Sequence, residues 1–370
     1  MKKIYLSPPH MSGKELDYIK EAFDQNWIAP IGPQLNKFEE DVAKYVGSKY
    51  AVAVSSCTAG LHLALRALGV EEGDFVLCSS LTFIGTVNPI IYCGANPILI
   101  DSEEDTWNMD PILLEKAIIE STQINGRKPK AIIPVHMFGI PCDMESIKKL
   151  SDEYDIPIIE DAAESLGSTY DNQHTGTIGS IGVYSFNGNK LLTTSGGGVI
   201  VTNDKDKADY MRFLSTQAKD PFPYYHHTDI GYNYRMSNIV AAIGIGQMEV
   251  LESHIKRTRE IHNTYKKELS GLFYSFLEER ETDRSNMWLT CALMTSDPTD
   301  LINYLNEKNI EARRIWKPMH QQPVLKRYQK YINSNSDILF SQGICLPSGS
   351  SMTDEDLNRV IKEIKTFFKK

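Results

Sequence analysis

Residues 158–165 read IIEDAAES, and residues 185–198 read SFNGNKLLTTSGGG. The first stretch begins within the short, β-branched run IPII at 156–159, which is typical of a strand covered on both faces, and the second begins within the run GVYSF at 182–186. The first strand ends at Asp161, and Lys190 lies in the polar turn after the second. Since the carboxyl ends of parallel strands share one edge of a sheet, we expect this carboxylate and this lysine at the same rim.

A lysine and an acid at one rim suit pyridoxal phosphate chemistry. The lysine amine bonds the cofactor aldehyde, and the acid keeps the pyridine nitrogen protonated. The same residue types also have ordinary structural roles, because most lysines are solvated and a strand-end acid often caps a helix. These two residues alone leave both interpretations open.

The composition indicates a two-lobed protein that does not bind nucleic acid. The 370 residues exceed what one core usually holds, and we expect a large lobe at 1–250 and a small one at 251–370. The net charge is −9, and no basic tract is present that would suit nucleic acid. No apolar run is long enough to span a membrane, and no secretory leader is evident, so we expect a cytoplasmic protein.

Residues that bind metals or form disulfides do not occur at the usual spacings. The six cysteines are scattered without a CxxC pair, and no HExxH sequence occurs. We therefore expect no metal and reduced cysteines.

The segment SSCTAG at 55–60 is a candidate phosphate site. It follows an apolar run at 51–54 and opens an apolar helix, and the amino end of a helix attracts anions. An ordinary Ser or Thr helix cap explains the segment equally well. No Walker loop and no GxGxxG after a strand occurs, which argues against nucleotide triphosphates and dinucleotides.

Strand and helix patterns alternate through the first lobe. Apolar runs at 75–78, 98–100 and 131–135 are separated by helical stretches, which predicts an α/β fold with a mostly parallel sheet and helices on both faces. Phe83 follows one such strand, and its ring is either core or a platform for a flat ligand. Beyond about residue 250, charged helices and short strands predict a small α+β lobe.

Taken together, the motifs resemble those of the DegT/DnrJ/EryC1/StrS family of sugar aminotransferases over essentially the full chain. The motifs that carry the resemblance, in chain order, are SSCTAGLHLALRAL, LTFIGT, IEDAAES, SFNGNK, GGG, GYNYRMSN, KPMHQQP and ICLPSG. The resemblance implies a fold-type-I aminotransferase with pyridoxal 5'-phosphate. It also implies a homodimer with shared active sites.

The resemblance assigns Lys190 and Asp161 as the catalytic pair. The implied cofactor contacts are Thr58, Ala59, Phe83, Asp161, Glu164, Ser185, Lys190 and, from the neighbouring subunit, Asn233. Glu164 departs from the amide or histidine of many members, and a carboxylate would repel an ionised ring oxygen. Its role stays open at this point.

Within the family, SPPHMSG, NWIAPIGP and TTSGGG resemble the UDP-N-acetylbacillosamine transaminase branch. That branch transfers an amino group from L-glutamate to C4 of a UDP-linked 4-keto-6-deoxy-N-acetylhexosamine, for bacterial glycan or exopolysaccharide synthesis. The alternatives are a GDP- or dTDP-linked keto sugar and a non-catalytic cofactor-binding regulator. A dehydratase of the family is disfavoured, because those members replace the lysine.

Substrate contacts are expected around two aromatic segments, although each residue can equally be a packed side chain or a solvated charge. The candidates are Trp27, Ile28, Ala29, Arg235, Trp316, Lys317 and His320.

Overall fold

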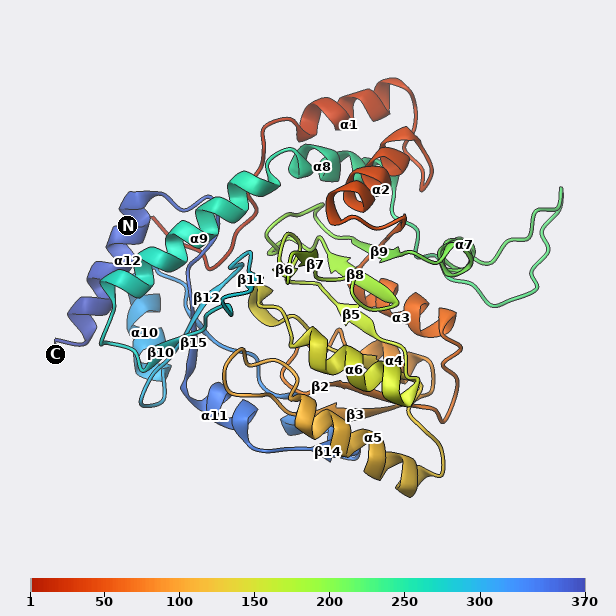
Figure 1. Ribbon diagram of the computed structural model, residues 1–370. Coiled ribbons are helices and arrows are strands. Elements are labelled where there is room, and N and C mark those ends of the chain that lie inside the picture. The colour runs from red at the N-terminus through yellow and green to blue at the C-terminus, as the bar shows by residue number, and fades with distance from the viewer. Residues whose placement is uncertain (1, 370) are drawn as a thin grey trace.

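The first lobe is built on eight strands that form two sheets joined edge to edge. The computed structural model describes residues 2–369, and Figure 1 shows the arrangement of its elements. The strands are β1 (Tyr50–Val54), β2 (Phe75–Ser79), β3 (Asn96–Ile100), β4 (Ala131–Ile133), β5 (Ile159–Asp161), β8 (Ile181–Ser185), β9 (Gly198–Thr202) and β14 (Lys330–Tyr331). The sheet orders are β1-β9-β8-β5 and β14-β3-β2-β4. Parallel bridges from Ile132 to Ile158 and from Val135 to Asp161 connect them.

Helices cover both faces of this sheet, as the sequence predicts. They are α1 (Glu15–Asp24), α2 (Pro33–Val46), α3 (Cys57–Ala67), α4 (Asn88–Tyr92), α5 (Pro111–Asn125), α6 (Met144–Tyr154), α7 (Lys205–Ser215) and α8 (Asn238–Met248). In β1, Val52 and Val54 pack in the cluster with α3 and α7, whereas Ala51 and Ala53 pack with α2 and α8. This alternation is the period of two expected for a strand buried on both sides.

The pairing is mixed where β9 lies, since β9 is antiparallel to both β1 and β8. The other pairs of these two sheets, including β5 with β8 and β2 with β3, are parallel. The expectation of a mostly parallel α/β sheet is confirmed.

The second lobe is an antiparallel sheet with helices against it. Its strands are β10 (Ser275–Phe276), β12 (Thr290–Leu293), β13 (Arg313–Arg314) and β15 (Gly343–Leu346), and its helices are α9 (Leu251–Glu268), α10 (Thr299–Glu307), α11 (Asn335–Gln342) and α12 (Asp354–Phe367). A shared core on one face includes Ala292, Ile344 and residues of α9, α10 and α12. The other face packs toward the first lobe through Cys291, Cys345 and Trp288.

The predicted boundary at residue 250 falls between α8 and α9. Several segments from before and after this position nevertheless pair with one another. Ile4, near the start of the chain, bridges to Ile310 of the second lobe. β14 returns to pair with β3. A fourth, small sheet joins β6 (Thr169–Tyr170) and β7 (Gln173–His174) to β11 (Asp283–Arg284). Short 3-10 turns complete the elements: η1 (Met137–Gly139), η2 (Met319–Gln321) and η3 (Pro323–Leu325).

Two further features concern the surface and the helices. After α7, residues 217–231 form an arm without helix or strand that extends away from the lobe in Figure 1. Among residues 2–369, no helix combines the length and apolar character that a membrane crossing requires.

Candidate active site

The strand ends of the first sheet bring the two predicted catalytic side chains to one edge. Asp161 is the last residue of β5, and its carboxylate is buried with 4% of the residue exposed. Thr86 donates its hydroxyl to Asp161 Oδ2 at 2.7 Å, and the Ala163 amide donates to Oδ1 at 3.1 Å. The thiol of Cys57, at the start of α3, lies 3.9 Å from Oδ1.

Asp161 lacks an ion-pair partner among residues 2–369. Burial raises the pKa of this carboxyl above its ordinary value, while the hydrogen bond from Thr86 and the more remote charge of Lys190 act in the opposite direction. A buried acid with hydrogen bonds but no touching cation is suited to receive a positively charged N–H group.

Lys190 lies in a small enclosure formed by a carboxylate and an aromatic ring. Its ammonium is 3.1 Å from Glu164 Oε1 and 4.0 Å from the centre of the Trp288 ring. The side chains of Lys190 and Glu164 are 14% and 5% exposed. The lysine is therefore neither solvated nor free, which excludes the ordinary surface interpretation.

Glu164 is fixed from two directions. The Phe138 amide donates to Glu164 Oε2 at 2.8 Å, and the Asn286 side-chain amide donates to the Glu164 carbonyl at 2.9 Å. Phe138 has a φ of 55°, a left-handed conformation that is costly for a bulky side chain. The loop at 137–139 thus directs a backbone N–H toward the carboxylate.

The amino end of α3 has a helix cap in the structure. Ser56 is the cap residue, and its hydroxyl accepts from the Ala59 amide at 3.1 Å. An anion at Ala59 would therefore compete with Ser56. Thr58 lies half-buried next to Gly85, where an added Cβ would be 3.1 Å from both Thr58 Oγ1 and Phe83 Cδ1.

Phe83 and Ser185 are available at the same edge. Phe83 is 66% exposed and lies, like Thr58, against Gly85, so its ring is not part of the core. Ser185 ends β8, is half-buried, and pairs with Gly198 of β9. Asn233 is exposed in the segment after the arm.

Two of the residues considered for substrate binding have partners inside this chain. The Arg235 guanidinium pairs with Glu39 and donates to the Ala53 carbonyl at 3.0 Å. His320 is buried, with Nδ1 2.8 Å from Ser80 Oγ and Nε2 2.8 Å from Asp337 Oδ1. Both side chains therefore link elements of this subunit, and the structure does not bring them to Lys190.

The remaining substrate candidates are divided between two places. Trp27, Ile28 and Ala29 are exposed in the loop between α1 and α2, and Lys317 is exposed before η2. Trp316 packs beside Phe138 and Trp288, with ring centres 5.4 and 6.5 Å apart, so it adjoins the lysine enclosure. Its indole N–H is buried without a protein acceptor among the described residues.

Sequence reasoning missed Thr86, Trp288 and the Phe138 amide. Thr86 belongs to the LTFIGT motif, and this membership was the only signal in the sequence that could have found it. Trp288 precedes the apolar run of β12 and is indistinguishable there from a core residue. A backbone amide has no sequence signal at all.

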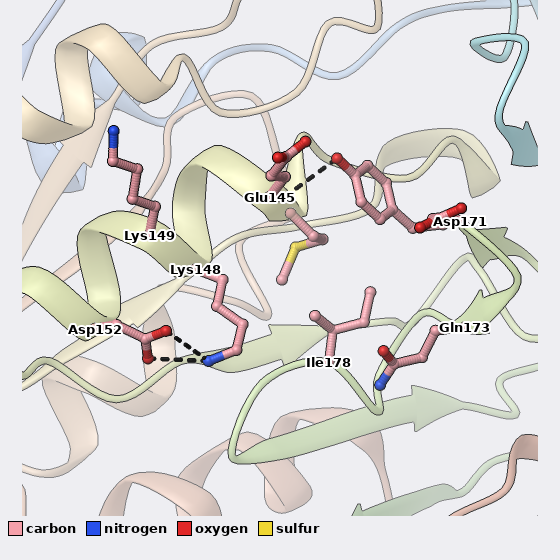
Figure 2. Close-up of a pocket in the computed structure, with 9 residues that line it drawn as sticks. Glu145, Lys148, Lys149, Asp152, Asp171, Gln173 and Ile178 are labelled. Carbon is pink, nitrogen blue, oxygen red and sulfur yellow. Dashed lines mark hydrogen bonds and ion pairs between the residues drawn. The ribbon is translucent and has the colours of Figure 1, made fainter.

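Pockets elsewhere involve none of these side chains. Figure 2 shows one of about 460 Å³ beside α6, where Lys148 pairs with Asp152 and the Tyr170 hydroxyl faces the Glu145 amide. Its lining residues carry no predicted site function. Within residues 2–369, no group of three or more His, Cys, Asp or Glu side chains is arranged to hold a metal.

Comparison with known proteins identifies the family. The model of the DegT/DnrJ/EryC1/StrS aminotransferase family matches residues 9–365. The chain belongs to this family. It is 50% identical to EpsN of Bacillus subtilis (strain 168), whose name describes a pyridoxal phosphate-dependent aminotransferase, over 99% of this chain and 96% of that protein. It is also 39% identical to the GDP-perosamine synthase of Escherichia coli O157:H7, over 100% and 99% of the two chains.

Solved structures of the family agree with the fold. The sugar aminotransferase Spr1654 from Streptococcus pneumoniae, in its PLP form, superposes with a TM-score of 0.91 at 26% identity, covering 99% of this chain and 98% of that one. The expectations of fold type I, of pyridoxal phosphate as cofactor and of transaminase activity are confirmed. The bacillosamine-type substrate stays a prediction.

The residues present fit the cofactor. The buried Asp161 without a touching cation suits a protonated pyridine nitrogen, and the enclosed Lys190 suits a bond to an aldehyde. Phe83 offers an exposed ring beside the amino end of α3. The acid, amine and aromatic surface therefore form a set with the chemistry that pyridoxal phosphate requires.

Proposed function

We propose that this sugar aminotransferase moves an amino group from L-glutamate to C4 of a UDP-linked 4-keto-6-deoxy-N-acetylhexosamine, for a bacterial glycan or exopolysaccharide. The observation that carries the chemistry is the enclosed Lys190 at the same edge as the buried Asp161. The substrate assignment is supported by the small, neutral tract at 193–198 that follows the lysine, together with the branch motifs at 7–13 and 26–33.

In this proposal each residue has one task. Pyridoxal phosphate, when bound, supplies an aldehyde for amines and a ring that takes up the electrons of the bond broken at the donor Cα. Lys190 would hold that aldehyde through its amine, and its free amine would take the proton from the donor Cα. Asp161 keeps the ring nitrogen protonated, and Thr86 fixes the direction of the Asp161 carboxylate. Thr58 and Ser185 hold the phosphate, and Phe83 covers the ring.

Substrate binding is proposed at the aromatic segments that remain accessible or adjoin the lysine. Trp27, Ile28 and Ala29 form one wall, and Lys317 meets the diphosphate. Trp316 has an unused indole N–H beside the enclosure, which suits an oxygen acceptor. Arg235 and His320 hold protein partners instead.

A homodimer completes the site in this proposal. Large apolar side chains are exposed on the arm and on α1, including Tyr225 at 82%, Ile230 at 75% and Leu16 at 75%. Exposed apolar groups of this size suit burial against a second copy. Asn233, at the end of the arm, would then reach the phosphate of the neighbouring subunit. We place the enzyme in the cytoplasm, where its six free cysteines stay reduced.

A GDP-linked 4-keto sugar is the second candidate substrate. The 39% identity to a GDP-perosamine synthase favours it. The deciding experiment supplies the PLP-loaded enzyme and glutamate with UDP-, GDP- and dTDP-linked 4-keto sugars and identifies aminated products by mass. Amination of the UDP-linked N-acetylhexosamine in preference to the others supports the proposal, and amination of GDP-linked sugars alone would replace it with the second candidate.

The role of Lys190 is tested with Lys190→Ala. We expect activity to fall by at least about a thousandfold, because one change removes both the covalent bond and the proton carrier. Borohydride reduction followed by mass spectrometry should no longer attach the cofactor to the protein. The control is Lys205→Ala, because Lys205 is exposed and paired with Asp209. This variant should retain both the activity and the attachment of the cofactor after borohydride reduction. Cofactor trapped in Lys190→Ala at wild-type levels would refute the assignment.

A further inference from the structure

We propose that Glu164 is a positioning residue that holds the Lys190 amine against Trp288 whenever this lysine is not bonded to the cofactor. The inference rests on the proposed role of Lys190. It answers the question raised by a carboxylate at a position where many family members have an amide or a histidine.

The contact itself is the first support. The Lys190 ammonium lies 3.1 Å from Glu164 Oε1 and 4.0 Å from the Trp288 ring centre. Both charged side chains are nearly buried, at 14% and 5% exposure. In such surroundings an ammonium needs a close counter-charge, and an aromatic face adds to the attraction. Glu164 and Trp288 supply these two contacts.

The carboxylate is held in place, so it can set the position of the amine. Glu164 uses Oε2 to accept the Phe138 amide at 2.8 Å, which leaves Oε1 for the lysine. The donating amide belongs to a residue with a φ of 55°, and the next residue, Gly139, has a φ of 93°. Costly backbone conformations of this kind persist where the surrounding structure enforces them.

The aromatic side of the enclosure is attached to the same framework. The Trp288 indole donates to the carbonyl of Asn189, next to the lysine, at 2.8 Å. The Trp288 amide donates to Asn286 Oδ1 at 2.9 Å, and Asn286 Nδ2 donates to the Glu164 carbonyl at 2.9 Å. Two residues from the second lobe therefore tie together the Trp288 ring, the backbone of Glu164 and the backbone beside the lysine.

A resting position matters because transamination releases this lysine in each half-reaction and needs it again for proton transfer. A long, flexible side chain loses reactivity when it is not confined near the reacting atoms. Loss of the Glu164 charge should therefore slow the amino-transfer steps while leaving the cofactor-holding groups at Asp161 and α3 in place.

The first test measures Trp288 fluorescence in the cofactor-free protein, where no turnover occurs. Glu164→Gln keeps the size of the side chain and an oxygen for the Phe138 amide but removes the charge. We expect it to change the indole emission as Lys190→Ala does, because in both variants the ammonium leaves the ring. The double variant should show no further change, and Trp288→Phe identifies which part of the signal belongs to Trp288.

The control is Glu252→Gln, which removes the ion pair with Arg284 and the hydrogen bond from Tyr45 and contacts none of Glu164, Lys190 and Trp288. It should leave the Trp288 signal unchanged. Wild-type emission in Glu164→Gln combined with altered emission in Lys190→Ala would overturn the inference. Additive changes in the double variant would also overturn it, because they would show that the two side chains act independently.

The second test is a single turnover of PLP-loaded enzyme with glutamate. Glu164→Gln should slow it by about tenfold or more, the scale of a lost hydrogen bond to a charged group, with cofactor affinity unchanged. An unchanged rate would overturn the inference. The proposed function fails separately: it fails if Lys190→Ala still bonds the cofactor, whatever Glu164→Gln does.

Discussion

At the scale of single residues, the carboxyl of Asp161 connects stability with function. Its pKa is raised by burial, and no cation touches it in the described chain. A carboxyl whose pKa is higher in the folded than in the unfolded state stabilises the fold while it is protonated. That stabilisation is lost when the carboxyl ionises. The ionised form that the cofactor needs is thus unfavourable until the cofactor arrives.

We therefore expect Asp161→Asn to melt a few degrees higher than the wild type when both lack cofactor at pH 8. The difference should narrow as the pH is lowered from 8, because the wild-type carboxyl gains its proton as the pH falls through its raised pKa. Differential scanning fluorimetry across this pH range measures the effect. Added cofactor should stabilise the wild type more than the variant.

Asp155→Asn is the matched control. A hydrogen bond from Lys128 lowers the pKa of Asp155, the opposite direction. Neutralising that exposed carboxyl should not raise the melting temperature at pH 8. Equal gains in both variants would contradict the account of Asp161.

Sequence patterns predicted the position of some site residues and not of others. Asp161 and Lys190 follow recognisable strands and belong to motifs, so their placement at one edge could be predicted. The placement of Trp288 could not be predicted, because it lies about a hundred residues after Asn189 and Lys190, which it contacts. Its local sequence is that of any core tryptophan. Arg235 belongs to a motif but pairs with Glu39 through a contact that no local pattern reveals.

At the scale of elements, the short turn η1 links the two lobes. A side chain on Gly139 would place its Cβ 2.0 Å from Asn286 Oδ1, and the residue has a φ of 93°. The Ser168 and Ser285 hydroxyls donate to the Gly139 carbonyl at 2.7 and 2.9 Å. This position therefore requires glycine for both conformation and space.

Gly139→Ala should lower the free energy of unfolding by at least about 2 kcal/mol, because strain and a steric clash act together. Gly126→Ala is the control: its φ is 68°, and no atom lies within 4 Å of the added Cβ, so only strain of about 1 kcal/mol is expected. Urea unfolding followed by circular dichroism measures both. Equal losses would show that the contact with Asn286 is unimportant.

Element prediction succeeded where local patterns were strong. The strands β1, β2 and β3 followed from the apolar runs at 51–54, 75–78 and 98–100. The helices α8 and α9 are separated at Glu249 and Val250, where Val250 adopts a non-helical conformation. The two-residue strand β14 was not foreseen, because its pairing with β3 depends on tertiary contacts alone.

At the scale of the whole molecule, the arm at 217–231 is the most exposed apolar feature. Phe222 and Tyr225 are 46% and 82% exposed. If the arm packs on a second copy, the double variant Phe222→Ser/Tyr225→Ser should shift the protein from dimer toward monomer, since it removes aromatic area from the contact. Sedimentation velocity over a range of concentrations measures this shift.

Tyr274→Ser is the control for the arm, because Tyr274 is 74% exposed in the second lobe. It should sediment like the wild type. A dimer of unchanged stability in the arm variant would exclude the arm from the interface.

The return of the chain to β3 has a consequence for synthesis on the ribosome. Lys330 and Tyr331 pair with Leu99 and Ile100, and the Asp101 carboxylate accepts the backbone amides of residues 333, 334 and 336. Until these late residues emerge, β3 is an open edge in the nascent protein, and open edges promote aggregation. The sheet β14-β3-β2-β4 is thus completed only when nearly nine-tenths of the 370 residues have been made.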